Sequence, residues 1–104
     1  MRYALSSIAI MLALTTQQAS AASDSASTAA GQQAYAKNCA SCHRSENPRL
    51  GDKAAWEPLF AKGTEALVAS VINGKGTMPP HGGKPRLPHS DIEAAVIYMM
   101  EKSK

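Results

Sequence analysis

Two cysteines and a histidine stand close together in the sequence, as Cys39-Ala40-Ser41-Cys42-His43. The chain has no other cysteine. Two thiols that are separated by two residues and followed directly by a histidine form the pattern to which a c-type haem is attached. Each thiol would form a thioether with one vinyl group, and the histidine would ligate the iron. We therefore expect one covalently bound haem c, with Cys39 and Cys42 as its anchors and His43 as an axial ligand.

The cysteine pair also has simpler explanations. A thioredoxin-like redox dithiol requires a strand and a helix around it, and nothing resembling a strand precedes Cys39. A zinc site requires four ligands, and no second pair of cysteines or histidines follows at the spacing of a zinc finger. A plain disulfide or a chance pattern is the last alternative, but the whole five-residue run is improbable by accident in a chain with so few cysteines.

A second axial ligand is expected in the run Gly76-Thr77-Met78-Pro79-Pro80. The thioether of Met78 is a soft, neutral ligand that favours ferrous iron, and the two prolines would restrict the backbone that carries it. Two alternatives compete with this hypothesis. Met78 could merely fill a gap in the core, or His81 in the same loop could bind the iron instead. We prefer Met78 as the sixth ligand.

Residues 1–21 are predicted to be a secretory signal peptide. A mainly apolar stretch from Ala4 to Leu14 follows Arg2, and Ala19-Ser20-Ala21 is a cleavage motif of small residues. The apolar stretch is too short to span a membrane, and an uncleaved anchor is the alternative. Export fits the haem hypothesis, because the thioethers are formed outside the cytoplasm. We expect a periplasmic protein without stable membrane insertion after cleavage.

Residues 22–30 are rich in Ser and Ala and are predicted to be a flexible tether, which leaves residues 31–104 as the folded domain. A domain this short buries a small core and depends on a staple. The haem would be that staple, and we expect the chain without haem to be largely unfolded. The formal net charge of +3 includes Arg2. Without Arg2, and with two haem propionates, the protein would be near neutral, so its charge gives no support for nucleic-acid binding.

The folded part has helical patterns, and no segment alternates with period two, so the predicted class is all-α. A first helix over residues 31–38 would deliver the cysteines to the haem. Asp52 would cap a short helix from Lys53 to Trp56, and Pro58 would mark its end or a following turn.

Two further helices are predicted in the second half of the chain. Thr64 is the expected N-cap of one helix, which Asn73-Gly74 would end. Lys75–Pro88 is then a loop rich in Gly and Pro. Ser90 opens a capping box before the last helix. The predicted inward face of that helix consists of Ile92, Ala95, Val96 and Met99.

The haem motif, the later Met-Pro loop and the final short helix together resemble a class I cytochrome c. The runs from Pro48 to Trp56 and from Ile72 to Pro80, followed by Gly82-Gly83, resemble the small bacterial cytochrome c-five subfamily. The resemblance covers about residues 31–100. It implies a small cytochrome c fold, with four to five short helices around one haem, and a role in electron transfer.

The resemblance also implies cofactor-binding roles for Pro48 and Trp56. The carbonyl of Pro48 would accept a hydrogen bond from His43 and fix its ring. The indole N–H of Trp56 would point toward a haem propionate, although a purely structural Trp is the alternative. Leu59 stands where the subfamily often has an arginine for a propionate, and Arg49 is a candidate replacement.

The resemblance places Gly31 and Tyr35 where the first helix crosses the last one, near Tyr98. Besides Leu59, the sequence departs from the subfamily in the loop between His43 and Pro48, which is shorter than usual. The extra cysteine pair of some relatives is also missing.

The expected function is that of a periplasmic single-haem electron carrier, which shuttles one electron at a time between respiratory redox partners and is not itself an enzyme. Expected partners are redox proteins such as a membrane cytochrome complex, an oxidase or a dehydrogenase, and the protein is expected to be a monomer. Lys75, Lys84 and Arg86 would steer it toward an acidic partner surface if they rim the haem edge. The alternative is a haem enzyme or gas-binding sensor with a displaceable sixth ligand.

Overall fold

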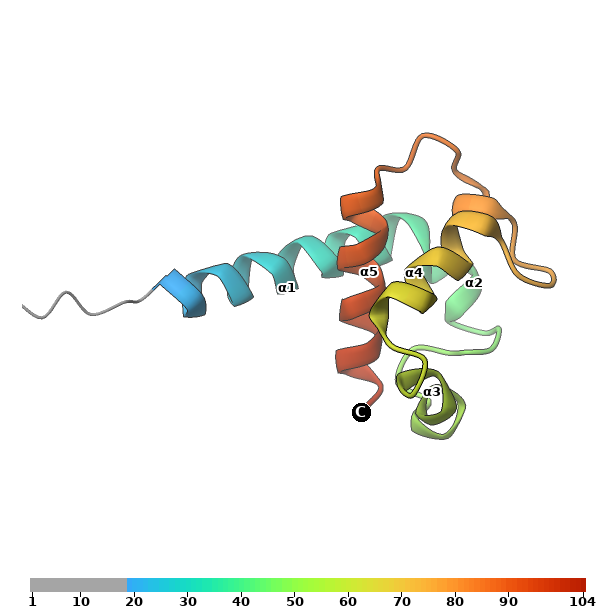
Figure 1. Ribbon diagram of the computed structural model, residues 1–104, viewed down its shortest axis with the longest axis horizontal. Helices are drawn as coiled ribbons and strands as arrows, with labels where there is room; N and C mark the ends of the chain where they lie inside the picture. The colour runs from blue at the N-terminus through green and yellow to red at the C-terminus, as the bar shows by residue number, and fades with distance from the viewer. Residues whose placement is uncertain (1–18) are drawn as a thin grey trace, which may run out of the picture.

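The computed structural model describes residues 19–104 (Figure 1). In that part of the chain it contains helices and no strand, which confirms the all-α prediction. The elements are α1 (Ala19–Asn38), α2 (Ala40–His43), α3 (Lys53–Phe60), α4 (Thr64–Asn73), a 3-10 turn η1 (Pro80–Gly83) and α5 (His89–Lys102). None of these helices is both long enough and apolar enough to cross a bilayer. Most of the predicted signal peptide lies outside the described residues.

Helix α1 is longer than the sequence pattern suggested. The predicted helix over residues 31–38 is its C-terminal part, but the helix already begins at Ala19. Residues 22–30, for which the sequence predicted a flexible tether, are part of this helix in the structure. Ala is the strongest helix former, and residues 22–30 contain neither Gly nor Pro. They can therefore form a helix although they have no periodic apolar face. Figure 1 shows this first part of α1 extending away from the other helices.

The C-terminal half of α1 crosses α5 at close range. A Cβ atom added to Gly31 would lie 2.5 Å from the carbonyl oxygen of Ala94 and 2.9 Å from Cβ of Tyr98. One helical turn later, the rings of Tyr35 and Tyr98 pack with centroids 5.5 Å apart. The crossing expected from the family resemblance is therefore present, and Gly31 is required there because two backbones meet.

Helix α5 provides much of the core, and its predicted inward face is confirmed. All four of its predicted residues are buried, namely Ile92, Ala95, Val96 and Met99. The predicted capping box is wrong, because α5 begins at His89 and has Pro88 as its N-cap without a side-chain cap. Pro88 has a backbone φ of −62° and ψ of 148°. This extended residue lets the helix begin directly after it, one residue before Ser90.

Helices α3 and α4 follow the prediction with two differences. Asp52 caps α3 as expected, because its Oδ1 accepts a hydrogen bond from the backbone N–H of Ala55 at 3.2 Å. However, α3 continues past Pro58 to Phe60. A proline there removes only one backbone hydrogen bond from a short helix.

At the start of α4, Gly63 rather than Thr64 is the N-cap. The Thr64 hydroxyl instead donates to Sδ of Met100 at 3.7 Å. The predicted end of α4 is confirmed, since Gly74 follows it with a φ of 80°.

Candidate functional site

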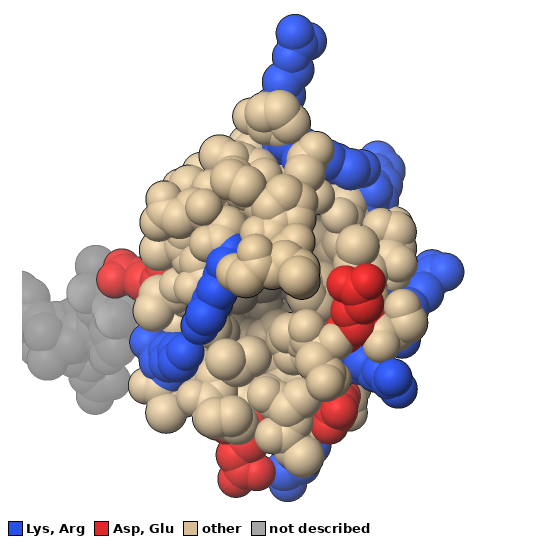
Figure 2. All heavy atoms as spheres, turned by 90° about the vertical axis from the view of Figure 1, so that its right-hand side faces the viewer, with Lys and Arg blue, Asp and Glu red and all other residues tan. Residues whose placement is uncertain are grey.

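The residues predicted to hold the haem meet at one pocket of about 340 Å³. The pocket is lined by all of them: Cys39, Cys42, His43, Pro48, Trp56 and Met78. Helices α4 and α5 contribute mainly apolar side chains to its walls, including Leu67, Val71, Ile92, Val96 and Met99. Figure 2 shows a hollow in this face of the molecule, surrounded largely by uncharged residues. Segments from both halves of the chain therefore build one apolar chamber with few polar groups.

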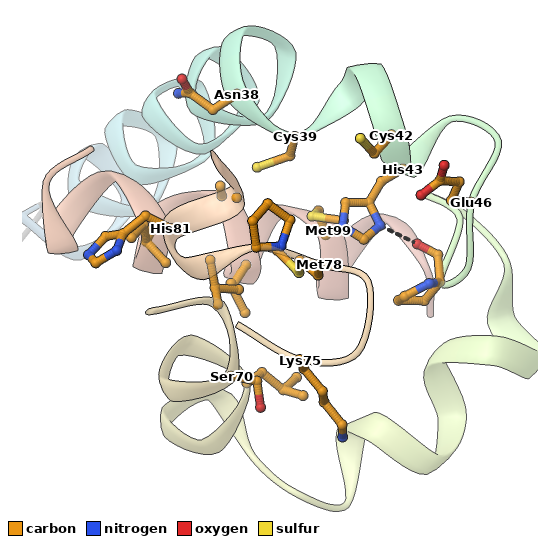
Figure 3. Close-up of a pocket in the computed structure, with 18 of the residues that line it drawn as sticks. Asn38, Cys39, Cys42, His43, Glu46, Ser70, Lys75, Met78, His81 and Met99 are labelled. Atoms are coloured by element: carbon orange, nitrogen blue, oxygen red, sulfur yellow. Dashed lines mark hydrogen bonds between the residues drawn. The ribbon is translucent and has the colours of Figure 1, made fainter. Parts of the chain in front are cut away.

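The two cysteines lie at the junction of α1 and α2. Cys39 separates the two helices, and the backbone N–H of His43 bonds to the carbonyl of Cys39 at 3.0 Å. This single helical turn brings both thiols to one side of the pocket (Figure 3). They form no disulfide; Cys39 is half-buried and Cys42 is exposed. Burial, opposed by the nearby charge of Lys84, raises the pKa of the Cys39 thiol.

The imidazole of His43 is held by one hydrogen bond. Its Nδ1 lies 2.9 Å from the carbonyl oxygen of Pro48, as expected from the family resemblance. A carbonyl oxygen can only accept, so Nδ1 carries the proton and Nε2 keeps its lone pair. This is the state in which a neutral imidazole binds a metal, and the carbonyl increases its strength as a ligand.

Met78 enters the pocket from the loop after α4 (Figure 3). Lys75 and Met78 exchange two backbone hydrogen bonds, each of 3.0 Å, which close a tight turn. Gly74 fits beneath this turn, because a Cβ atom there would lie 2.9 Å from the backbone nitrogen of Pro80. The position of the thioether is thus determined by a closed turn and the two prolines that follow it.

His81, the alternative ligand, lines the same pocket as Met78 but lies at another part of it and has an unusual backbone conformation. Figure 3 shows its ring to one side, well away from His43. His81 has a φ of 55°, which is unusual for a residue other than glycine. The arrangement favours Met78 over His81 as the partner of His43.

Trp56 is buried beside the pocket, and its indole N–H bonds to the backbone of the chain. The indole N–H donates to the carbonyl oxygen of Arg49 at 2.8 Å, whereas the family resemblance implied a haem propionate as its partner. The backbone turn at Arg49 lies within reach of the buried indole, and this contact satisfies the N–H without a ligand. The side chain of Arg49 donates through Nε to the carbonyl of Ser45 at 2.8 Å.

The cations of the loop are placed unequally around the pocket. Lys75 lines it, whereas Lys84 donates to the carbonyl of Lys37 at 2.8 Å and Arg86 is not among the lining residues. Lys62 lies close to Lys75, and this neighbouring lysine lowers the pKa of Lys62. Lys62 and Lys75 therefore form a local pair of lysines at one part of the rim, and Lys84 lies close enough to Cys39 for its charge to act on that thiol.

One contact near the site had no signal in the sequence. Ser103 is almost completely buried, with 1% of its surface exposed, and its hydroxyl accepts a hydrogen bond from the backbone N–H of Gly51 at 2.9 Å. The two residues are 52 positions apart, so no local pattern could have paired them.

The donor set of this pocket fits a haem better than a bare metal ion. Within residues 19–104, no group of three or more His, Cys, Asp or Glu side chains could hold a metal ion. The pocket instead offers one imidazole nitrogen, one thioether sulfur, mainly apolar walls and two thiols at one side. These are the features that a flat apolar macrocycle with a central iron requires.

Comparisons with known proteins agree with this geometry. Residues 26–99 match the family described as cytochrome C oxidase, cbb3-type, subunit III. Cytochrome c-555 of Chlorobaculum thiosulfatiphilum is 45% identical over 83 residues, which cover 73% of this chain and 96% of the relative. Cytochrome c6 of Leptolyngbya boryana is 36% identical over 83 residues, which cover 75% of this chain and 95% of the relative.

A solved structure shows the same similarity in three dimensions. It is described as the electron transfer complex of nitrite reductase with cytochrome c, and one of its chains superimposes with a TM-score of 0.69 at 45% identity. The match covers 72% of this chain and 95% of that chain. The narrower resemblance to the cytochrome c-five subfamily remains an expectation, since the relatives above are named c-555 and c6. At the level of the family the findings agree: this chain belongs to the class I c-type cytochromes, which bind haem c covalently and carry electrons without catalysing a reaction.

Proposed function

We propose that the protein is a periplasmic electron carrier in which Nε2 of His43 and Sδ of Met78 are the two axial ligands of the haem iron. Cys39 and Cys42 would form the two thioethers. The observation that supports this most directly is the convergence of one free imidazole nitrogen and one thioether on a mainly apolar pocket that has two unpaired thiols at its side.

When bound, the haem supplies a one-electron couple between ferric and ferrous iron. The residues of the chain have three tasks around it. Pro48 holds the His43 ring in a fixed orientation and tautomer. The closed turn at Lys75 and Met78 holds the sulfur, and the apolar side chains of α4 and α5 exclude water. With both axial positions filled by the protein, no position remains for a substrate or a gas.

A partner would approach from the open side of the pocket, where Cys42 is exposed and Lys75 lies at the rim. Lys62 and Lys75 together provide a local positive charge, which favours an acidic partner surface and short-lived encounters. The expected partners are redox proteins such as a membrane cytochrome complex, an oxidase or a dehydrogenase. A nitrite reductase is a further candidate, because it is the partner of the solved relative.

Export and cleavage are part of the same proposal. Cleavage after Ala21 would fall near the beginning of α1, so the mature chain would keep nearly all of that helix. We expect a mature periplasmic monomer.

Mass and spectra of the exported protein test the proposal. Intact mass should equal that of the chain without residues 1–21 plus one haem. The oxidised spectrum should show the weak near-infrared charge-transfer band from sulfur to ferric iron. A bare polypeptide mass would refute haem attachment, and a high-spin spectrum would refute ligation by both His43 and Met78 and favour a haem enzyme or gas sensor.

A further inference from the structure

The short segment from Pro48 to Gly51 carries the carbonyl that holds the axial histidine. Pro48 accepts the hydrogen bond from Nδ1 of His43 at 2.9 Å. Two residues later, the backbone N–H of Leu50 donates to the carbonyl of His43 at 3.0 Å. The segment therefore contacts His43 at both its side chain and its backbone, and any shift of the segment changes the surroundings of the ring.

The segment is fixed on one side by α3. The carbonyl of Arg49 accepts hydrogen bonds from Nε1 of Trp56 at 2.8 Å and from the backbone N–H of Asp52 at 3.1 Å. Arg49 directly follows Pro48, so these two bonds restrain the peptide next to the critical carbonyl.

The segment is fixed on its other side by the end of the chain. The N–H of Gly51 donates to Oγ of Ser103 at 2.9 Å. Ser103 follows α5 directly, and its own N–H donates to the carbonyl of Met100 at 3.1 Å. Its hydroxyl is thus attached to the last turn of a helix whose residue Met99 lines the pocket. A hydroxyl with 1% exposure needs a partner within the protein, and Gly51 supplies it.

We propose that Ser103 is a positioning residue for the axial histidine. Its hydroxyl holds Gly51, Gly51 holds the peptide segment that contains the Pro48 carbonyl, and this carbonyl determines how strongly His43 donates to iron. The inference rests on the proposed function, in which Nε2 of His43 is an axial ligand. A carbonyl bonded to Nδ1–H increases the electron donation of the imidazole, which stabilises ferric relative to ferrous iron.

The test compares variants of the exported, haem-loaded protein. In Ser103→Ala, the segment loses its restraint on the side of α5 and keeps those on the side of α3, so the bond from His43 to Pro48 weakens. The midpoint potential should rise, and the Nδ1 proton of His43 should exchange with solvent faster in the reduced protein, as measured by NMR. Ser90→Ala is the matched control, since Ser90 is exposed at the other end of α5, and it should change neither quantity.

A second pair of variants separates the effect of the Ser103 hydroxyl group from the effect of side-chain size. Ser103→Thr keeps the hydroxyl, while Ser103→Val has nearly the same shape without it. The Thr variant should have the midpoint potential and the exchange rate of the wild type. The Val variant should have those of Ser103→Ala. This pair also decides the question if Ser103→Ala does not fold.

Unchanged potential and exchange rate in the variants without the hydroxyl would overturn the inference, even if their melting temperature fell, because Ser103 would then serve stability alone. That result would leave the proposed function intact as long as the wild type shows the sulfur-to-iron band. A wild type without His and Met ligation would overturn both.

Discussion

The Met78 sulfur can be removed without touching the rest of the axial site. In Met78→Ala the sulfur-to-iron band should disappear and the midpoint potential should fall, because the thioether favours ferrous iron. Absorption spectra and spectroelectrochemistry measure both effects. Met100→Ala is the control, since Met100 lies in α5 and outside the pocket, and it should keep the band.

The same variant also decides between Met78 and His81. If the band persists in Met78→Ala, Met78 is not the ligand. If Met78→Ala loses the band but stays low-spin, the double variant with His81→Ala shows whether His81 has taken the free position, since only its removal would then produce a high-spin iron.

The crossing of α1 and α5 is the most sensitive contact between two helices. Gly31→Ala should destabilise the protein by about 1–3 kcal/mol, because the new methyl group overlaps the backbone of α5. The roughly 1 kcal/mol that Ala gains over Gly in a helix interior offsets part of this cost, but the 2.5 Å approach to a backbone oxygen places the overlap at the upper end of the range. Thermal unfolding of the haem-loaded protein measures the change. Gln32→Ala, at an exposed position of the same helix, should have almost no effect, and equal stability of the two variants would contradict the close crossing.

Tyr35, which lies at the same crossing, should make the protein less stable at alkaline pH. Burial, more than the neighbouring Cys39 and Tyr98, raises the pKa of the Tyr35 hydroxyl. The unfolded chain therefore releases this proton first, and stability falls as the pH rises above the usual value of about 10. Melting temperatures at about pH 8 and about pH 11 should show a smaller loss for Tyr35→Phe than for wild type. Equal losses would mean that Tyr35 does not contribute to the pH dependence.

For the molecule as a whole, the pocket occupies much of a small core. Without haem, this pocket of about 340 Å³ leaves the apolar walls formed by α4 and α5 open to water, and each Å² of apolar surface that is not buried forgoes about 25 cal/mol. Small domains have only about 5–15 kcal/mol of stability in total. The mature chain produced without haem should therefore be largely unfolded by far-UV circular dichroism. A cooperative melt of a helical chain without haem would contradict this.

Docking is the other property of the whole molecule. Electron-transfer rates with an acidic redox partner should fall as ionic strength rises, because attraction between exposed charges is screened. Lys75→Gln should lower the rate at low salt and reduce its salt dependence. Lys102→Gln removes the same charge at the end of α5, outside the pocket lining, and should matter less. If the two variants behave alike, the rim of the pocket is not the docking surface.

Local patterns in the sequence predicted much of this protein. The spacing of Cys39, Cys42 and His43 indicated the haem, since thioether formation and ligation depend on side chains only a few residues apart. The Met78 loop and the buried face of α5 were also predicted. The starts of helices were predicted less well, because Gly63 and Pro88 compete with Thr64 and Ser90 for the cap, and the winner depends on the packing of the preceding chain.

Other features were decided only by the tertiary structure. The indole N–H of Trp56 donates to the carbonyl of Arg49. The Ser103 hydroxyl accepts from the N–H of Gly51, 52 residues away. A buried donor or acceptor bonds to whatever polar atom folding brings near it, and that neighbour is not encoded in adjacent residues. The sequence by itself therefore determined which chemistry the chain can perform, since that chemistry is covalent and short-range. The tertiary structure decided how the segment behind the axial histidine is fixed, because the bond from Gly51 to Ser103 joins segments that meet only after the chain has folded.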